Sequence, residues 1–100
     1  MSKANVDHDV GANAFVIHLG KDGKEKALLE YVKEGDVLNL WHTEVPVNHR
    51  RQGLGAHLAK AALDHAVEKN YQVKPTCTYI QKYLKDNPLA EYTERVIPID

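Results

Sequence analysis

The stretch from residue 37 to residue 70 constrains the fold most, because it joins a strand pattern to a helix pattern through a loop that contains glycine. Apolar residues over 37–45 predict a strand, and apolar residues at three- and four-residue intervals over 54–70 predict an amphipathic helix. The loop between them reads Arg-Arg-Gln-Gly-Leu-Gly-Ala over residues 50–56. A strand that enters a helix through such a loop directs free backbone N–H groups and the positive end of the helix dipole at one place. The sequence therefore predicts an anion site, suited to a phosphate, at residues 50–56.

The residues before this stretch predict an antiparallel meander. Apolar side chains alternate over 14–19, and residues 20–23, Gly-Lys-Asp-Gly, supply the chemistry of a hairpin turn. Residues 26–32 then form the returning strand. Residues 1–11 show no apolar period, so we expect them to be a flexible lead-in.

The residues after the helix complete a crossover. Residues 72–79 predict a strand, and a right-handed connection through the helix sets it parallel to the strand at 37–45. Residues 80–87 predict a helix that Pro88 ends, and residues 92–97 predict a last short element. The chain therefore predicts an α+β (α/β) fold, in which an antiparallel meander leads into a strand–loop–helix–strand crossover and a C-terminal helix.

Length and composition exclude several classes of protein. One hundred residues predict a single domain, 1–100, because so short a chain cannot bury two separate cores. No stretch reaches the roughly 18–20 apolar residues of a membrane span and the N-terminus has no secretory pattern, so we expect no membrane role and a cytoplasmic location. The net charge of −1, from 13 basic and 14 acidic residues, argues against broad binding to nucleic acid. A single cysteine excludes an intramolecular disulfide, and the six histidines lack the spacing of a metal site.

The motif Arg-x-x-Gly-x-Gly at residues 50–55 directly follows a strand and lacks the Gly-Lys-Ser/Thr of a Walker loop. It resembles the pyrophosphate-binding signature of the GNAT superfamily of acetyl-CoA-dependent N-acetyltransferases, usually written Gln/Arg-x-x-Gly-x-Gly/Ala. Residues 42–46, 58–64, 76–83 and 87–88 extend the resemblance, which covers residues 14–97. It is nearest to the short, single-domain branch of that superfamily, the small "N-acetyltransferase domain-containing" proteins.

The resemblance implies that the loop holds the pyrophosphate of acetyl-CoA, or of coenzyme A, through backbone N–H groups. Arg50 or Arg51 would add a charge-assisted hydrogen bond, and glycine at 53 and 55 removes Cβ atoms that would block the approach. It also implies that the strand ending at Val45 diverges from the next parallel strand and leaves backbone groups for the pantetheine arm. The expected cofactor-binding residues are Thr43, Val45, Arg50, Arg51, Gln52, Gly53, Leu54, Gly55, Ala56 and Asn87.

Cys77 is the first candidate catalytic residue. On the strand predicted over 72–79 it would share a face with Val73, Pro75 and Tyr79. A lone cysteine on such a face is commonly a small apolar residue of the core. The short branch of the family implies the alternative, a thiolate that lies near the thioester, accepts the acetyl group and passes it on.

His42 and Glu44 are candidates for the general base. With regular alternation along the strand, they would share the face of Leu38 and Leu40. The resemblance implies a carboxylate on this strand that takes the proton of the attacking amine, directly or through water, which makes Glu44 the first candidate and His42 the second. The alternatives are a solvated strand end for Glu44 and a hydrogen-bonded core histidine for His42.

The family pattern also implies a tyrosine that donates a proton to the departing thiolate, for which Tyr79 and Tyr83 are candidates unless they simply pack. Larger family members place helices between their first two strands, whereas only residues 20–25 occupy that gap here. The acceptor side is therefore expected to be open or completed by another molecule. The sequence predicts an N-acetyltransferase that acts on an unidentified amine or, alternatively, a non-catalytic CoA-binding or protein-interaction module.

Overall fold

The computed structural model describes residues 5–50 and 52–98, which form a five-stranded sheet and several helices. Strands β1 to β4 pair antiparallel in chain order, and β5 joins β4 in parallel, as the predicted crossover requires. The α+β fold class is therefore confirmed. The strands are β1 (Asp7–Asp9), β2 (Ala14–Leu19), β3 (Glu25–Glu34), β4 (Val37–Glu44) and β5 (Gln72–Lys74). The helices are the 3₁₀ turn η1 (Val47–His49), α1 (Leu54–Lys69), α2 (Thr78–Asp86) and α3 (Ala90–Thr93).

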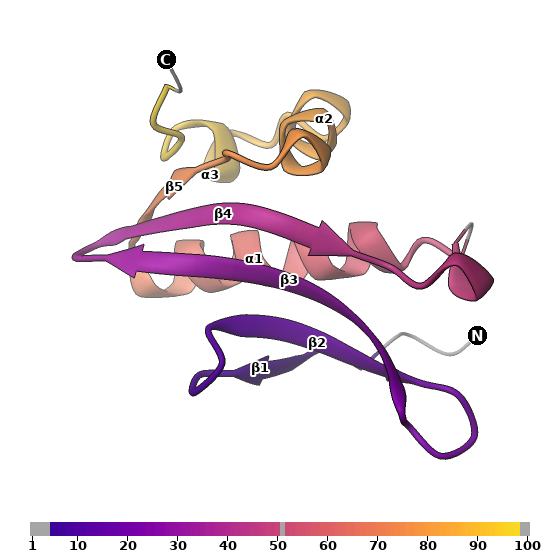
Figure 1. The fold of residues 1–100 in the computed structure, drawn as a ribbon. Coiled ribbons are helices and arrows are strands. Elements are labelled where there is room, and N and C mark those ends of the chain that lie inside the picture. The colour runs from indigo at the N-terminus through magenta and orange to yellow at the C-terminus, as the bar shows by residue number, and fades with distance from the viewer. Residues whose placement is uncertain (1–4, 51, 99–100) are drawn as a thin grey trace.

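Helix α1 crosses one face of the sheet, and α2 and α3 pack against α1 (Figure 1). Ala59, Ala62 and Ala66 have no exposed surface, because their small side chains let α1 lie close to the strands. Leu40 of β4 and Leu58 of α1 are likewise fully buried between the two layers. Within the described ranges, no helix covers the opposite face of the sheet, and none is long and apolar enough to cross a membrane.

Strand β1 corrects part of the expectation that residues 1–11 form a flexible lead-in, because Asp7–Asp9 pair with β2, whereas residues 1–4 lie outside the described residues. His8 holds this edge strand. Its ring stacks on Phe15 with the ring centroids 4.3 Å apart, and its Nε2 lies 2.6 Å from the hydroxyl of Tyr31. One inward-pointing side chain is too little to appear as an apolar period in the sequence.

A β-bulge interrupts β4 at Trp41. Tyr31 of β3 pairs with Leu40, whereas the preceding residue, Glu30, pairs with His42. Trp41 therefore has no partner on β3, and the extra residue reverses the alternation of the side chains that follow it.

The bulge overturns the predicted faces of β4. The sequence pattern placed His42 and Glu44 beside Leu40, on the core face. They instead point to the face opposite α1, whereas Thr43 pairs with the buried Leu29 and points to the side of α1. Regular alternation was the wrong assumption, because a bulge depends on the pairing with β3 and leaves no mark in the sequence of β4 alone.

Strand β5 is shorter than the predicted strand over 72–79. Pro75 has no backbone N–H with which to continue the ladder. The N–H of Cys77 donates to the carbonyl of Leu40 at 2.9 Å, and the carbonyl of Cys77 accepts from Ile80 at 3.1 Å, which starts α2. Cys77 is therefore the N-cap of α2 rather than a member of a strand face.

The C-terminal residues 92–97, predicted as one short element, divide between two structures. Tyr92 belongs to α3 and is buried, with its hydroxyl donating to the carboxylate of Asp64. Val96 forms a parallel bridge with Val73 of β5. The end of the chain thus extends the sheet by one bridge beyond β5.

Candidate functional site

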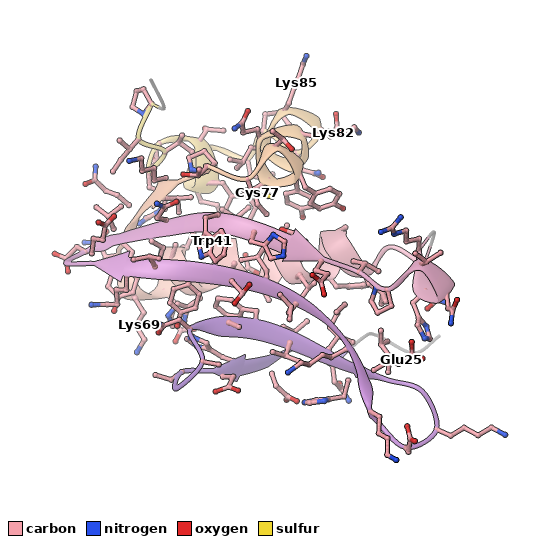
Figure 2. The ribbon with its side chains drawn as sticks, in the orientation of Figure 1. Glu25, Trp41, Lys69, Cys77, Lys82 and Lys85 are labelled. Atoms are coloured by element: carbon pink, nitrogen blue, oxygen red, sulfur yellow. The ribbon has the colours of Figure 1, made fainter. Side chains whose placement is uncertain are left out.

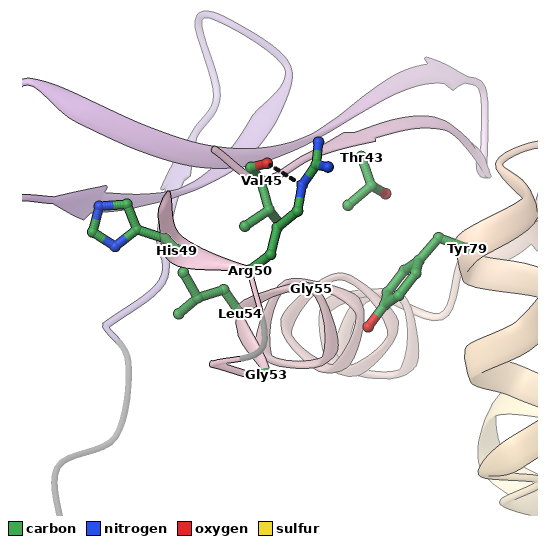
Figure 3. A pocket seen from close by; sticks show the side chains of 8 residues that line it. All are labelled: Thr43, Val45, His49, Arg50, Gly53, Leu54, Gly55 and Tyr79. Atoms are coloured by element: carbon green, nitrogen blue, oxygen red, sulfur yellow. Dashed lines mark hydrogen bonds between the residues drawn. The ribbon is translucent and has the colours of Figure 1, made fainter. Parts of the chain in front are cut away.

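A pocket of about 450 Å³ lies at the N-terminus of α1. This volume falls within the roughly 300–1,000 Å³ of small-molecule sites. The pocket brings together residues from β4, the loop after it, the first turn of α1 and α2 (Figure 3). Its lining residues are Thr43, Val45, His49, Arg50, Gly53, Leu54, Gly55 and Tyr79. All but His49 and Tyr79 belong to the cofactor-binding set expected from the sequence.

The loop presents backbone donors to this pocket. Gly53 is the N-cap of α1 and adopts a left-handed conformation with φ of 72°, which glycine tolerates best. Among the described residues, none accepts a hydrogen bond from the amides of Leu54, Gly55 or Ala56. The first turn of α1 also contains no acidic residue that would compete with an anion. The local charge distribution therefore favours an anionic ligand.

Arg50 contributes a cation at the rim of the pocket. Its Nε donates to the carbonyl of Val45 at 3.2 Å, which holds the side chain along the end of β4 (Figure 3). His49 lies beside it, with its Nε2 3.4 Å from Glu25 of β3. Arg51, the other expected cation, lies outside the described residues.

Gly55 also has a structural role that the sequence did not predict. A Cβ atom at this position would lie 2.8 Å from the ring and the hydroxyl oxygen of Tyr79. Glycine is therefore needed so that Tyr79 can pack against the first turn of α1 and form a wall of the pocket (Figure 3). The sequence offered no signal for this contact, because it joins residues far apart in the chain.

Strands β4 and β5 separate beside the pocket. Their pairing ends at Asn39 and Lys74, and within the described ranges no strand pairs with that edge of β4 farther along. The predicted divergence of two strands is replaced by an early end of β5 at Lys74, which leaves this edge of β4 without a described strand partner. Thr43 lies in this part of β4, and its Oγ1 is 3.4 Å from the Sγ of Cys77. Cys77 is partly buried and packs against the core, so the thiol lies at the inner end of the gap.

His42 and Glu44 lie on the other side of β4. The Nε2 of His42 is 3.4 Å from a carboxylate oxygen of Glu44, and the ring of His42 stacks on Trp41 at 5.2 Å between centroids. Both side chains of the ion pair are substantially exposed. The structure thus places Cys77 and the two candidate bases on opposite sides of one strand.

Residues 14–95 match the family model described as GCN5-related N-acetyl-transferase. The chain belongs to this family. It is 46% identical over 94 residues to human Protein NATD1, covering 93% of this chain and 82% of the human protein. It is 45% identical over 98 residues to Protein NATD1 of Xenopus tropicalis, covering 97% and 89% of the two chains. Family membership confirms the resemblance inferred from the loop and supports acetyl transfer as the general activity, with acetyl-CoA the acyl donor typical of the family.

The fold agrees with a solved member of the group. A GCN5-like protein from Staphylococcus aureus, determined in solution by NMR, superposes with a TM-score of 0.66 and covers 100% of this chain and 94% of its own. The two sequences are 22% identical, so this likeness concerns the fold alone. The expected GNAT-like arrangement of meander, crossover and C-terminal helix is therefore present.

Two candidate residues of this GCN5-related protein lie away from the pocket. Tyr83 packs against the core and faces Lys60 and Asp64 of α1, and burial raises the pKa of its phenol above the ordinary value. Asn87 is the C-cap of α2, where its Nδ2 donates to the carbonyl of Tyr83 at 3.0 Å. Nine helical residues separate Asn87 from Cys77, a distance of about 15 Å along the helix. Tyr79, one helical turn before Tyr83, is the tyrosine that lines the pocket.

Proposed function

We propose that the protein binds acetyl-CoA, with the pyrophosphate at the N-terminus of α1, and transfers the acetyl group to an amine. One observation carries the proposal. The pocket lies at the start of α1, where no described residue accepts from the amides of Leu54, Gly55 and Ala56, and it extends to Thr43, whose Oγ1 is 3.4 Å from the Sγ of Cys77. Arg50 supplies a positive charge at the pocket rim, as a diphosphate requires. This arrangement supports an anion site at one end of the proposed acetyl-CoA site and a reactive thiol at the other.

Cys77 is the proposed acetyl carrier. In the first step its thiolate attacks the carbonyl carbon of the thioester, a new C–S bond forms at Cys77, and the C–S bond to coenzyme A breaks. The departing thiolate of coenzyme A takes a proton, for which the candidate donor is the hydroxyl of Tyr79, the tyrosine that lines the pocket. In the second step an amine attacks the acetyl carbon on Cys77, the C–S bond at Cys77 breaks, and the Cys77 thiolate is restored as the amide forms.

The attacking amine must lose a proton, and His42 with Glu44 is the proposed acceptor pair. The two side chains lie 3.4 Å apart and are open to solvent on the face of β4 opposite Thr43. An amine that approaches from this face would meet them before it reaches the gap between β4 and β5. Because the pair lies on the far side of the strand, a water molecule is the expected relay.

The second candidate function is a CoA-binding module without turnover. The observation that favours it is the bare sheet face, because no described helix covers His42 and Glu44 to form an enclosed acceptor site. Such a module would keep the pyrophosphate site at α1 and lack a defined acceptor.

Intact-mass measurement after incubation with acetyl-CoA separates the two functions. Acetyl transfer through Cys77 predicts one added acetyl group in the wild type, none in Cys77→Ala, and its removal by neutral hydroxylamine, which cleaves a thioester and spares an amide. Tyr83→Phe is the matched control, because Tyr83 lies outside the pocket, and it should be acetylated as the wild type is. Binding of acetyl-CoA without acetylation of Cys77 or of any added amine would favour the module.

A further inference from the structure

The face of the sheet opposite α1, called the open face here, exposes apolar side chains beside the candidate bases. Trp41 is 46% exposed because the bulge turns it outward, and Val32 of the neighbouring strand is 44% exposed. In Figure 2 Trp41 lies over β4 on the side of the sheet away from α1. A half-exposed tryptophan next to an aliphatic residue is typical of the anchor of a binding surface.

The strand register places carboxylates around these apolar residues. Residues that pair directly across antiparallel strands point to the same face. Asp9 pairs with Ala14, Ala14 pairs with Glu30, and Glu30 pairs with His42, so all of them project from the open face. By the same register, the carboxylates of the open face are Asp7, Asp9, Glu30, Glu34 and Glu44.

Positive charge is scarce on the open face. Lys26 of β3 and Lys74 of β5 are the two lysines that the described strands direct to it, and His18 and His42 lie within 3.7 and 3.4 Å of Asp7 and Glu44. The lysines of the helices lie elsewhere, as Lys82 and Lys85 of α2 show in Figure 2. A cationic partner therefore meets net attraction on the open face and repulsion on the α2 side.

The shape of the open face indicates a polymer rather than a small molecule. Its carboxylates extend from β1 to β4, which spans roughly 14 Å at about 4.8 Å per strand. Small-molecule sites enclose most of their ligand. An exposed sheet face encloses nothing, but it can contact the spaced side chains of an extended segment at several points.

We propose that the open face docks a basic segment of another polypeptide, and that a lysine of this segment is the acetyl acceptor. The identity of the acceptor rests on the function proposed above. Trp41 would contact the aliphatic part or the ammonium group of one lysine, and Asp9 and Glu30 would bind others. Glu44 lies next in sequence to Thr43, which contacts Cys77 from the other side of β4. A lysine held at Glu44 would therefore lie beside the edge of β4 that has no described strand partner, and its amine would reach the acetyl group on Cys77 past that edge.

Amide chemical-shift titration tests this proposal with a probe of stated chemistry, a blocked heptapeptide of alternating lysine and serine. The expected result is a set of shifts confined to residues of β1, β3 and β4, with weaker binding at higher salt. The double variant Asp9→Asn/Glu30→Gln should weaken binding about threefold to tenfold, as the loss of two exposed charge pairs predicts. Trp41→Ala should weaken it at least as much.

Glu68→Gln/Glu94→Gln is the matched control, because it removes two exposed carboxylates outside the open face and should leave peptide binding unchanged. The proposal is overturned if the peptide shifts residues of α1 or α2 instead, or if both double variants bind equally. Spermine binding as tight as the peptide, with the same loss in Asp9→Asn/Glu30→Gln, would overturn the polypeptide as occupant.

Acetyl-CoA is titrated into the same samples. Failure of acetyl-CoA to bind would contradict the proposed function, whereas failure of the peptide alone would contradict this inference.

Discussion

At the scale of single residues, the contact between Gly55 and Tyr79 shapes one wall of the pocket. Alanine at position 55 would place its Cβ 2.8 Å from the Tyr79 ring, so the ring must move. In the Tyr79→Ala background this contact is removed, and Gly55→Ala should stabilise the protein by about 0.5–1 kcal/mol, as alanine does inside a helix. In the wild type this gain should be cancelled or reversed. Urea denaturation of the wild type, the two single variants and the double variant gives both values. An equal effect of Gly55→Ala in the two backgrounds would show that the position of the Tyr79 ring does not depend on Gly55.

The same residue pair shows what the sequence could and could not predict about the site. The loop at 50–56 was predictable because its glycines and the start of the apolar period are local features. Tyr79 lies 24 positions after Gly55, and no local pattern joins them. Only the structure could therefore show that α2 forms one side of the pocket. The same holds for the finding that Tyr83 and Asn87 lie away from the pocket.

At the scale of elements, the bulge at Trp41 decides which side chains reach the site. Deletion of Trp41 removes the unpaired residue and leaves Leu38, Leu40 and Thr43 on the side of α1. The variant should fold with a free energy of unfolding within about 1 kcal/mol of the wild type, since Trp41 is half exposed.

Deletion of Asn39 is the matched control, because it removes one residue of the same strand from the regular part of the ladder. It forces Leu40 out of the core and should cost about 2–5 kcal/mol, the range for losing a buried leucine. Urea midpoints compare the two deletions. Equal destabilisation would show that Trp41 is not an insertion in an otherwise regular ladder.

The elements themselves were largely predictable, and their interruptions were not. The helix over 54–70 and the meander strands follow from periods of 3.6 and 2 within each segment. The bulge, the early end of β5 and the start of α2 at Thr78 depend on contacts between segments, such as the hydrogen bond from Cys77 to Leu40. Because of these contacts, Cys77 is the N-cap of α2 rather than the residue on a strand face that the sequence pattern predicted.

At the scale of the whole molecule, two histidines link stability to pH. Their rings lie 4.6 Å apart between β1 and α1, and burial lowers the pKa of both His8 and His65 below the ordinary 6.5. Each also feels a nearby positive charge, from His65 for His8 and from Lys69 for His65, which the carboxylates of Asp9 and Glu68 partly oppose. The unfolded chain therefore binds protons at these histidines before the folded chain does. Their contribution to the free energy of unfolding should fall as the pH drops below about 6.5.

Urea denaturation at pH 7.5 and pH 5.5 measures this effect. The wild type should lose more stability between the two pH values than His65→Gln, which removes one of the two rings. His57→Gln is the matched control, since His57 is exposed on the same helix and should leave the pH dependence of the wild type unchanged. If His65→Gln shows the full loss of the wild type, the histidine pair does not set the acid sensitivity.

The central claim concerns the loop at the N-terminus of α1, and a matched pair of glycines tests it most directly. Gly53 and Gly35 both have positive φ, at 72° and 61°, and a Cβ at either position would lie more than 4 Å from every described residue except the neighbours in the chain. Valine therefore imposes a similar backbone cost at both, but only Gly53 lines the pocket. In a titration with coenzyme A, Gly53→Val should weaken binding more than about tenfold, or about 1.4 kcal/mol, whereas Gly35→Val should bind as the wild type does. Equal affinity of the two folded variants would contradict the assignment of the pyrophosphate to this loop.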